Sequence, residues 1–330
     1  MVRVSVVMAT YNGELYIKEQ ILSIVNQTKP PSEIIIVDDA STDNTVNLIL
    51  ELTKSIRIEI KLFVNKENMG VCKTFNKALL ECSGDLIFLA DQDDFWYENK
   101  IEKMEDIMIS DKTLGCCICN VDLSDGNLNM LGLTMNESVI RRGRRINDRV
   151  MGAASCYRSS LIDFAMPIPD TVHSHDKWLS TIANYLNCKK MIYTSYQKYR
   201  LHDSNVVGDR NALIEPAGLV QKLKRKIQKF DSLEINKNLK RDLNILYEIN
   251  QLFLSKPKLN NSPYLPSIER ALLEVSNQML IVKSRIFFHK ISLFKRIIRI
   301  IELRLKHGKL YAWTKILQDL FVRATDGISA

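Results

Sequence analysis

The sequence predicts an α/β fold in which helices flank a doubly wound sheet, followed by a largely helical C-terminal region. Strand-like and helix-like segments alternate over the first ~120 residues, which is typical of βαβ units. The polar residues of this part collect where the predicted strands end, and ligands bind at that edge in open α/β sheets. From about residue 215 the pattern is helical, with prolines at 257, 263 and 266. We therefore expect two domains, residues 1–212 and residues 213–330.

The first three predicted strands alternate with helices. Strands are expected at residues 3–9, 33–37 and 58–64. Helices are expected at residues 14–27, from a cap at 41–43 through residue 53, and at residues 74–80. The first helix ends before Pro30-Pro31, and its apolar face consists of Leu15, Ile21, Leu22 and Val25.

A fourth strand at residues 85–89 is short and almost wholly apolar, as in a buried parallel strand. It leads into three carboxylates, Asp91, Asp93 and Asp94. Carboxylates crowded at a strand end repel one another unless a cation lies among them. Ions such as Mg²⁺ bind one or two carboxylates together with phosphates, so the cluster predicts a divalent metal that holds a diphosphate. A solvated acidic turn is the alternative.

The pattern is weaker beyond residue 120. Residues 122–129 contain Asp-Gly-Asn and are expected to form a turn. Residues 137–149 hold five arginines and are expected to be an exposed loop. A helix is expected from His175 to residue 186, and a short strand near residues 191–194.

Composition narrows the class of protein. The content of 46% hydrophobic and 25% charged residues is typical of a soluble globular protein. The chain lacks a signal peptide and an apolar run of ~18 residues, so we expect a cytoplasmic protein without a membrane span. The seven cysteines lack paired CxxC spacing, which favours reduced, buried thiols over a structural zinc. Residues 211–330 hold 22 basic against 10 acidic residues, whereas residues 1–210 hold 24 against 28, which suggests different partners for the two parts.

Four motifs at the predicted strand ends carry a resemblance to a known family. They are VMATYNG at 7–13, VDDASTD at 37–43, NMG at 68–70 and DQDD at 91–94. In order, spacing and placement they resemble the family-2 glycosyltransferases of the GT-A fold, over residues 1 to about 210. The resemblance implies a Rossmann-like mixed sheet flanked by helices. It also implies an enzyme that transfers a sugar from a nucleotide-sugar donor with inversion, using Mg²⁺ or Mn²⁺.

Three later motifs narrow the resemblance. GAASCYR at 152–158, HDKW at 175–178 and YRLH at 199–202 with Asn205 resemble the bacterial rhamnosyltransferase-type branch. Enzymes of that branch build surface polysaccharides and do not all use rhamnose. The donor is therefore left open between dTDP-L-rhamnose and a UDP-hexose, and the acceptor is expected to be a lipid-linked saccharide.

The resemblance assigns the nucleotide-base pocket to the first two strand ends. Thr10, Tyr11 and Asn12 would line the pocket, and Asp39 would hydrogen-bond the base, since a carboxylate accepts from a base N–H. Two simpler readings remain: Tyr11 packs the first turn, and Asp39 caps the following helix.

The same resemblance assigns further contacts with the donor. Asn68 and Gly70 would approach the ribose and the donor, with glycine allowing close backbone contact. An ordinary turn at residues 68–70 is the alternative. Asp91 would contact the ribose or the sugar, and Arg200 would neutralise phosphate charge.

The metal and the catalytic base complete the implied site. Asp93 would hold the metal against the diphosphate, and His202 would ligate the metal or contact the diphosphate, unless it is structural. Asp176 would be the general base that takes the proton of the acceptor hydroxyl. An N-cap role for His175-Asp176 is the alternative, because Asp is favoured at that position.

The C-terminal part contains a basic amphipathic stripe. Its apolar residues recur at helical spacing, at Phe287, Ile291, Phe294, Ile298, Ile301 and Leu305. Such a helix can lie on an anionic membrane, which predicts peripheral contact with the inner face of the cell membrane. Packing onto the catalytic domain or a second subunit is the alternative. No nucleic-acid partner is expected, because no reading motif accompanies the basic residues.

Two other functions are compatible with parts of the sequence pattern. A non-catalytic nucleotide-sugar-binding or scaffold subunit of a polysaccharide assembly complex would share the same fold. A dehydrogenase is excluded because no G-x-G-x-x-G follows the first strand.

Overall fold

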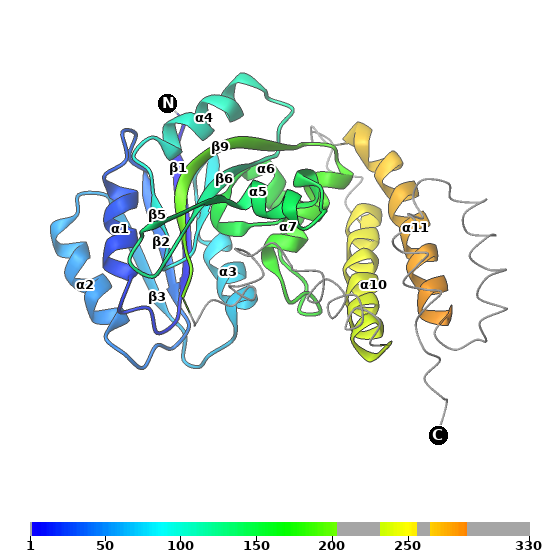
Figure 1. The fold of residues 1–330 in the computed structure, drawn as a ribbon, viewed down its shortest axis with the longest axis horizontal. Coiled ribbons are helices and arrows are strands. Elements are labelled where there is room, and N and C mark those ends of the chain that lie inside the picture. The colour runs from blue at the N-terminus through cyan, green and yellow to red at the C-terminus, as the bar shows by residue number, and fades with distance from the viewer. Residues whose placement is uncertain (1, 203–231, 256–264, 289–330) are drawn as a thin grey trace. The chain divides into compact units, whose positions relative to one another are not determined.

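The computed structural model describes residues 2–202, 232–255 and 265–288, and the chain divides into two compact units, Met1–Pro216 and Ala217–Ala330 (Figure 1). The first unit contains the sheet. The described part of the second unit consists of α10 (Ser232–Ser255) and α11 (Leu265–Phe288).

The sheet of the first unit is mixed. Its path runs β3 (Glu59–Val64), β2 (Glu33–Asp38), β1 (Val4–Thr10), β4 (Leu86–Ala90), β8 (Ser155–Arg158), β6 (Cys116–Ser124), β9 (Lys189–Arg200) and β5 (Phe95–Trp96), with β7 (Met130–Thr134) paired to β6. The strands β3, β2, β1 and β4 are parallel, and β8 joins β4 in the antiparallel sense. The expected mixed sheet flanked by helices is confirmed.

Helices cover both faces of this sheet (Figure 1). On one side lie α1 (Ile17–Val25) and α2 (Thr45–Ser55), and α3 (Val71–Leu80), α6 (Ser159–Ala165) and α7 (His175–Tyr185) lie on the other. Two further helices are α4 (Lys100–Ser110) and α5 (Met135–Arg141), with short 3-10 turns η1 (Ile146–Asp148) and η2 (Gly152–Ala154). Since the chain leaves β1 toward one neighbour and reaches β4 on the other side, β1 and β4 form the topological switch point where ligands bind.

The core lies between the parallel strands and these helices. All six residues of β2 and all five of β4 are buried, which agrees with the nearly continuous apolar runs of strands covered on both faces. Side chains such as Val6, Ile35 and Phe88 have no exposed surface, and burying each contributes about 1.5–3 kcal/mol. The three strand ends that carry the candidate site therefore project from a rigid base.

Two helices begin later than the sequence suggested. The helix α1 begins at Ile17, so Leu15 precedes it and is 79% exposed rather than part of its apolar face. The helix α2 has Asn44 as its N-cap, without a side-chain cap hydrogen bond. The expected cap at residues 41–43 is replaced by a turn in which Asp43 Oδ1 accepts the N–H of Thr45 at 3.0 Å.

The arginine-rich segment 137–149 is not the exposed loop that the sequence suggested. Its first part belongs to α5, because Thr134 and Glu137 form a capping box. Glu137 Oε2 accepts the Thr134 N–H at 2.7 Å, and Thr134 Oγ1 accepts the Glu137 N–H at 3.3 Å. Arg149 is buried.

Two strands extend further than expected. The strand β6 continues through Ser124, so the turn predicted at 122–129 is confined to the residues after it. The strand β9 has 12 residues and ends at Arg200, two residues before His202. Its length brings the YRLH motif to the edge of the sheet.

The two described helices of the second unit pack against each other. Ile249 and Phe253 of α10 and Ala271 and Val275 of α11 have no exposed surface. Pro266 lies in the first turn of α11, where proline is tolerated, and does not interrupt a helix. Outside the described residues lie Pro257, Pro263 and the basic amphipathic stripe, except for Phe287. Among the described helices, none is both long and apolar enough to cross a membrane.

A buried carboxylate joins three strands at the amino end of the sheet. Glu33 is fully buried at the start of β2. Its Oε1 accepts from Ser5 Oγ at 2.6 Å and from the Ser83 N–H at 2.8 Å, and Lys61 Nζ lies 2.9 Å from Oε2. Burial alone would raise the pKa of Glu33, but these bonds outweigh it and lower the pKa from 4.5 to about 2.

Glu33 is expected to make stability depend on pH in the acid range. Because the folded pKa lies below the unfolded one, the charged carboxylate stabilises the fold above pH 4.5 and loses that contribution as pH falls to 2. The contribution is about 3 kcal/mol. Urea unfolding at pH 5 and pH 3 should show a steeper loss for the wild type than for Glu33→Gln. Equal losses would contradict the assignment.

Candidate active site

Polar residues meet at the carboxyl ends of β1, β2 and β4, at the switch point of the sheet. The loop after β1 carries Thr10, Tyr11 and Asn12, and the loop after β4 carries the acidic cluster, defined as Asp91, Asp93 and Asp94. Residue 10 pairs with residue 38 of β2, and residue 8 with residue 90 of β4. The sheet register alone therefore brings these loops together.

Hydrogen bonds fasten the β1 loop to the β2 loop. Thr10 Oγ1 donates to Asp38 Oδ2 at 2.8 Å, so its hydroxyl is held by the protein. Asn12 has a φ of +47°, accepts the Thr42 N–H at 2.8 Å and donates its own N–H to Ser41 Oγ. Tyr11 is 45% exposed, which does not agree with the alternative that it packs the first turn.

Gln92, which the sequence analysis missed, clamps the β1 loop to the β4 loop. Its Oε1 accepts the Tyr11 N–H at 2.9 Å, and its Nε2 donates to the Tyr11 carbonyl at 3.0 Å. A Cβ at Gly13 would lie 2.3 Å from Gln92 Oε1, so only glycine leaves room for the clamp. The Tyr11 loop and the acidic cluster are thus one connected unit.

Asp39 organises the loop between β3 and α3. Its Oδ1 accepts from Asn65 Nδ2 at 2.9 Å and from the Met69 N–H at 2.8 Å, and its Oδ2 accepts the Gly70 N–H at 2.8 Å. Burial alone would raise the pKa of Asp39, but these bonds outweigh it and lower the pKa. Asp39 does not cap α2, whose N-cap is Asn44.

The Asn68–Gly70 segment forms a hydrogen-bonded turn on the surface. Asn68 Oδ1 accepts the Gly70 N–H at 3.2 Å. Gly70 has a φ of +87° and no atom within 4 Å of the position of a Cβ. Glycine is therefore required by the backbone conformation, and open space lies beside it.

The acidic cluster carries more negative charge than its surroundings balance. Burial, followed by the charges of Asp93 and Asp176, raises the pKa of Asp91 to about 7. Burial, followed by the charges of Asp93 and Asp91, raises the pKa of Asp94, which has no exposed surface. Asp93 Oδ2 lies 2.8 Å from His202 Nε2, and both side chains are 14% exposed. A cation at this position would relieve the repulsion.

The ligand set fits a divalent metal that also binds phosphate. In the described part of the chain, no group of three or more His, Cys, Asp or Glu side chains could hold a metal by itself. The Asp93 carboxylate and the His202 imidazole together offer one oxygen and one nitrogen ligand. Carboxylates suit Mg²⁺ and Mn²⁺, and the remaining positions of such ions are commonly filled by substrate phosphates and water.

Buried polar side chains form hydrogen bonds that fix Asp94 of the acidic cluster. Gln197 Nε2 donates to Asp94 Oδ2 at 2.8 Å, and Lys100 donates to Gln197 Oε1. Lys100 has no exposed surface, and its Nζ lies 3.6 Å from the ring of Trp96. Burial lowers the pKa of Lys100 to about 8. The sequence does not predict the contact between Lys100 and Gln197, because the two residues are 97 positions apart and no local pattern connects them.

Asp176 lies at the beginning of α7. The N-cap of this helix is Ser174, so Asp176 is not the cap. Asp176 Oδ1 accepts from Ser174 Oγ at 2.5 Å and from the Lys177 N–H at 2.7 Å, and these bonds orient the carboxylate. Since the charge of Asp176 contributes to the raised pKa of Asp91, the two carboxylates are close enough to interact.

Two tryptophans near the candidate site belong to the core. Trp96 and Trp178 are each 1% exposed, and Trp178 Nε1 donates to the Ala165 carbonyl at 3.0 Å. His175, beside Asp176, is also buried and stacks on Phe75 with ring centroids 3.9 Å apart. Burial lowers the pKa of His175.

Gly152 should be sensitive to substitution. A Cβ there would lie 3.1 Å from His175 Nε2 and 3.3 Å from Asp176 Cβ, so both neighbours would have to shift. Because small displacements of reacting groups are costly, we expect Gly152→Ala to lower kcat by about tenfold with little change in Tm. Steady-state kinetics should show no such loss in Gly126→Ala, where nothing lies within 4 Å. An equal kcat in the two variants would refute the close fit.

Comparison with known proteins adds independent findings. Residues 5–159 match the family described as Glycosyl transferase family 2. Over 215 residues the chain is 29% identical to UDP-Glc:alpha-D-GlcNAc-diphosphoundecaprenol beta-1,3-glucosyltransferase WfgD of Escherichia coli, covering 63% of this chain and 80% of that protein. Over 107 residues it is 40% identical to dTDP-rhamnosyl transferase RfbG of Shigella flexneri, covering 31% of this chain and only 37% of that protein.

A solved structure supports the fold. The 1–349 portion of S. aureus TarS in complex with UDP has a TM-score of 0.54 with this chain at 19% identity, covering 96% of this chain and 89% of that one. At this identity the likeness concerns the fold alone, and it agrees with a GT-A arrangement of the sheet.

Proposed function

We propose that this chain, whose residues 5–159 match the family described as Glycosyl transferase family 2, transfers a sugar from a nucleotide-sugar donor to a hydroxyl group. The hydroxyl group belongs to a growing, lipid-linked bacterial surface polysaccharide. The transfer is metal-dependent and inverts the anomeric carbon. The observation that carries the proposal is the Gln92 clamp, which joins the Tyr11 loop to the acidic cluster at the switch point of the sheet, and the charge of Asp176 acts on Asp91 of that cluster.

The donor is bound across the switch point. Tyr11 and Asn12 line the base pocket, Asp39 and the Asn68–Gly70 turn approach the base and ribose, and Asp91 contacts the ribose or sugar. The exposure of Tyr11 and the open space beside Gly70 support this assignment. WfgD is named for UDP-Glc and RfbG for a dTDP-rhamnosyl group, so the donor is dTDP-L-rhamnose or a UDP-hexose.

The reaction is a single displacement. The acceptor oxygen forms a bond to the anomeric carbon as the bond from that carbon to the diphosphate oxygen breaks, and the nucleoside diphosphate leaves with the electron pair. Asp176 accepts the hydroxyl proton, which makes the hydroxyl a competent nucleophile. Ser174 and Lys177 hold Asp176 Oδ1, so the proton goes to Oδ2. A divalent ion held by Asp93 and His202 would act as a Lewis acid toward the leaving diphosphate.

The acceptor is assigned by analogy and by charge. WfgD is named for a diphosphoundecaprenol-linked acceptor. Such an acceptor would be reached at the inner face of the cell membrane, and the excess of basic residues in 211–330 supports attraction to that anionic surface.

A thermal-shift panel of nucleotide sugars with Mn²⁺ tests the proposal. Binding only to the folded state raises Tm, so the correct donor should raise Tm more than its free sugar does, and should raise it further when metal is present. We expect either dTDP-L-rhamnose or one UDP-hexose to give the largest shift, and Asp93→Ala to remove the part of the shift that depends on metal. No shift with any nucleotide sugar would contradict the proposal. Slow, metal-dependent donor hydrolysis by the wild type would exclude a non-catalytic scaffold.

A further inference from the structure

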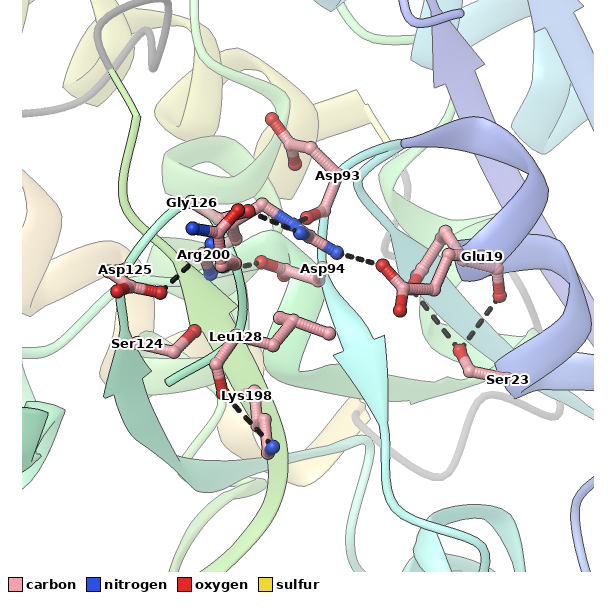
Figure 2. A network of polar contacts seen from close by, with 12 residues as sticks. Glu19, Ser23, Asp93, Asp94, Ser124, Asp125, Gly126, Leu128, Lys198 and Arg200 are labelled. Carbon is pink, nitrogen blue, oxygen red and sulfur yellow. Dashed lines mark hydrogen bonds and ion pairs between the residues drawn. The ribbon is translucent and has the colours of Figure 1, made fainter. Parts of the chain in front are cut away.

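Arg200 is enclosed by acceptors from three parts of the chain (Figure 2). Its side chain is 4% exposed at the end of β9. Nε donates to the carbonyl of Asp93 at 2.7 Å, Nη1 donates to the carbonyl of Gly126 at 2.6 Å, and Nη2 is paired with Glu19 of α1. The guanidinium therefore holds the backbone, not the carboxylate, of the residue assigned to the metal.

The first turn of α1 supports this arrangement from a second side. Tyr16, the N-cap of α1, lies under the guanidinium, with Arg200 Cζ 4.5 Å from the centre of its ring. The same ring lies 5.0 Å from the ring of His202. One aromatic side chain thus contacts both Arg200 and His202, while Glu19 is three residues further along the chain.

The carboxylate of Glu19 compensates the positive charge of the Arg200 guanidinium. A buried guanidinium beside a cation site repels a divalent ion, and the repulsion is strong where water is excluded. A buried charge is also costly unless it is paired. Glu19 supplies the compensating negative charge and is 49% exposed, so it can be replaced without opening a cavity in the core.

We propose that Glu19 and Arg200 are positioning residues for the divalent-cation site: Arg200 fixes the backbone of Asp93, and Glu19 neutralises the guanidinium so that a cation is accepted beside it. The proposal rests on the proposed metal-dependent function. It differs from the role that family resemblance implies for Arg200, because Arg200 then acts on the metal through Asp93 and not on the donor phosphates.

The two roles of Arg200 are separated by binding measurements that require no turnover. A ligand of the diphosphate contributes to nucleotide binding even in EDTA, whereas a positioning residue of the metal site affects Mn²⁺ binding even without nucleotide. The variants are Arg200→Lys and Glu19→Gln in the full chain. Glu51→Gln is the matched control, because it removes one exposed carboxylate from α2.

Free Mn²⁺ measured by electron paramagnetic resonance gives the metal Kd. We expect a rise of about tenfold for Arg200→Lys and about threefold for Glu19→Gln, no change for Glu51→Gln, and recovery in Glu19→Asp, which restores the charge. The Kd for UDP or dTDP in EDTA, measured by calorimetry, should stay within about twofold in all variants. Circular dichroism melts check that each variant is folded. If Arg200→Lys does not fold, the comparison of Glu19→Gln with Glu19→Asp decides the question.

The outcomes that overturn the inference are distinct from failure of the proposed function. Unchanged Mn²⁺ affinity in both Glu19→Gln and Arg200→Lys, or weaker metal-free nucleotide binding in Arg200→Lys, rejects the positioning role while leaving the function intact. A wild-type chain that binds neither Mn²⁺ nor nucleotide rejects the proposed function, and the inference with it.

Discussion

Asp176→Asn is expected to lower kcat by about 10²–10⁴-fold while leaving the Kd for the nucleotide sugar within about twofold. The amide is close in size to the carboxylate and still accepts from Ser174 and Lys177 through its oxygen, so α7 should keep its start. It cannot take the proton of the acceptor hydroxyl. Single-turnover kinetics with saturating donor and acceptor measure the loss directly.

The matched control for this variant is Asp170→Asn. Asp170 is 90% exposed and makes only a long contact of 3.9 Å with Lys73. The same chemical change there should leave kcat unaltered. If purified Asp176→Asn turned over at the wild-type rate, or if the two variants behaved alike, Asp176 would not be the base.

Asp93→Ala is expected to remove the metal dependence of donor binding. The substitution takes away one carboxylate of the proposed metal site and leaves His202 without its partner at 2.8 Å. The Kd for the donor in Mn²⁺ should then equal the Kd in EDTA, and activity should fall below detection. Isothermal titration of the donor with and without Mn²⁺ makes the comparison.

Asp85→Ala provides the control at the opposite end of the same strand. Asp85 Oδ2 accepts the Arg3 N–H at 2.8 Å, far from the switch point along β4. Its loss should affect stability only. A variant lacking Asp93 that kept both its activity and its Mn²⁺-enhanced donor binding would show that the metal lies elsewhere.

The parallel part of the fold could be predicted from the sequence because each signal is local. Apolar runs such as residues 85–89 mark buried strands, and the residues that follow them must lie at one edge of a parallel sheet. For the same reason the sequence predicts that the loop of Tyr11 lies beside the loop of the acidic cluster, in agreement with the hydrogen bond between the Tyr11 N–H and Gln92. The spacing of Thr134 and Glu137 is that of a capping box, a local signal that indicates the start of α5 where the arginine content alone suggests a loop.

Contacts between distant segments were not predictable. The pair between Glu19 and Arg200 spans 181 residues, and no periodicity or spacing records it. The resemblance to the family implies that Arg200 neutralises phosphate charge, whereas in the structure its guanidinium nitrogens already have protein acceptors. The prediction that Leu15 belongs to the apolar face of the first helix is wrong for a related reason. Helical spacing does not indicate at which turn the helix begins.

The clamp between Gln92 and the Tyr11 peptide bears on attempts to redesign this enzyme. A substitution that moves the Tyr11 backbone also pulls on Gln92, and thereby on the carboxylates on either side of it. In the proposed function the nucleotide and the cation bind on the two sides of this clamp, so the effect of the nucleotide on cation affinity equals the effect of the cation on nucleotide affinity. Under that proposal nucleotide selectivity and metal preference are coupled, and engineering that seeks a new donor will have to select for both together.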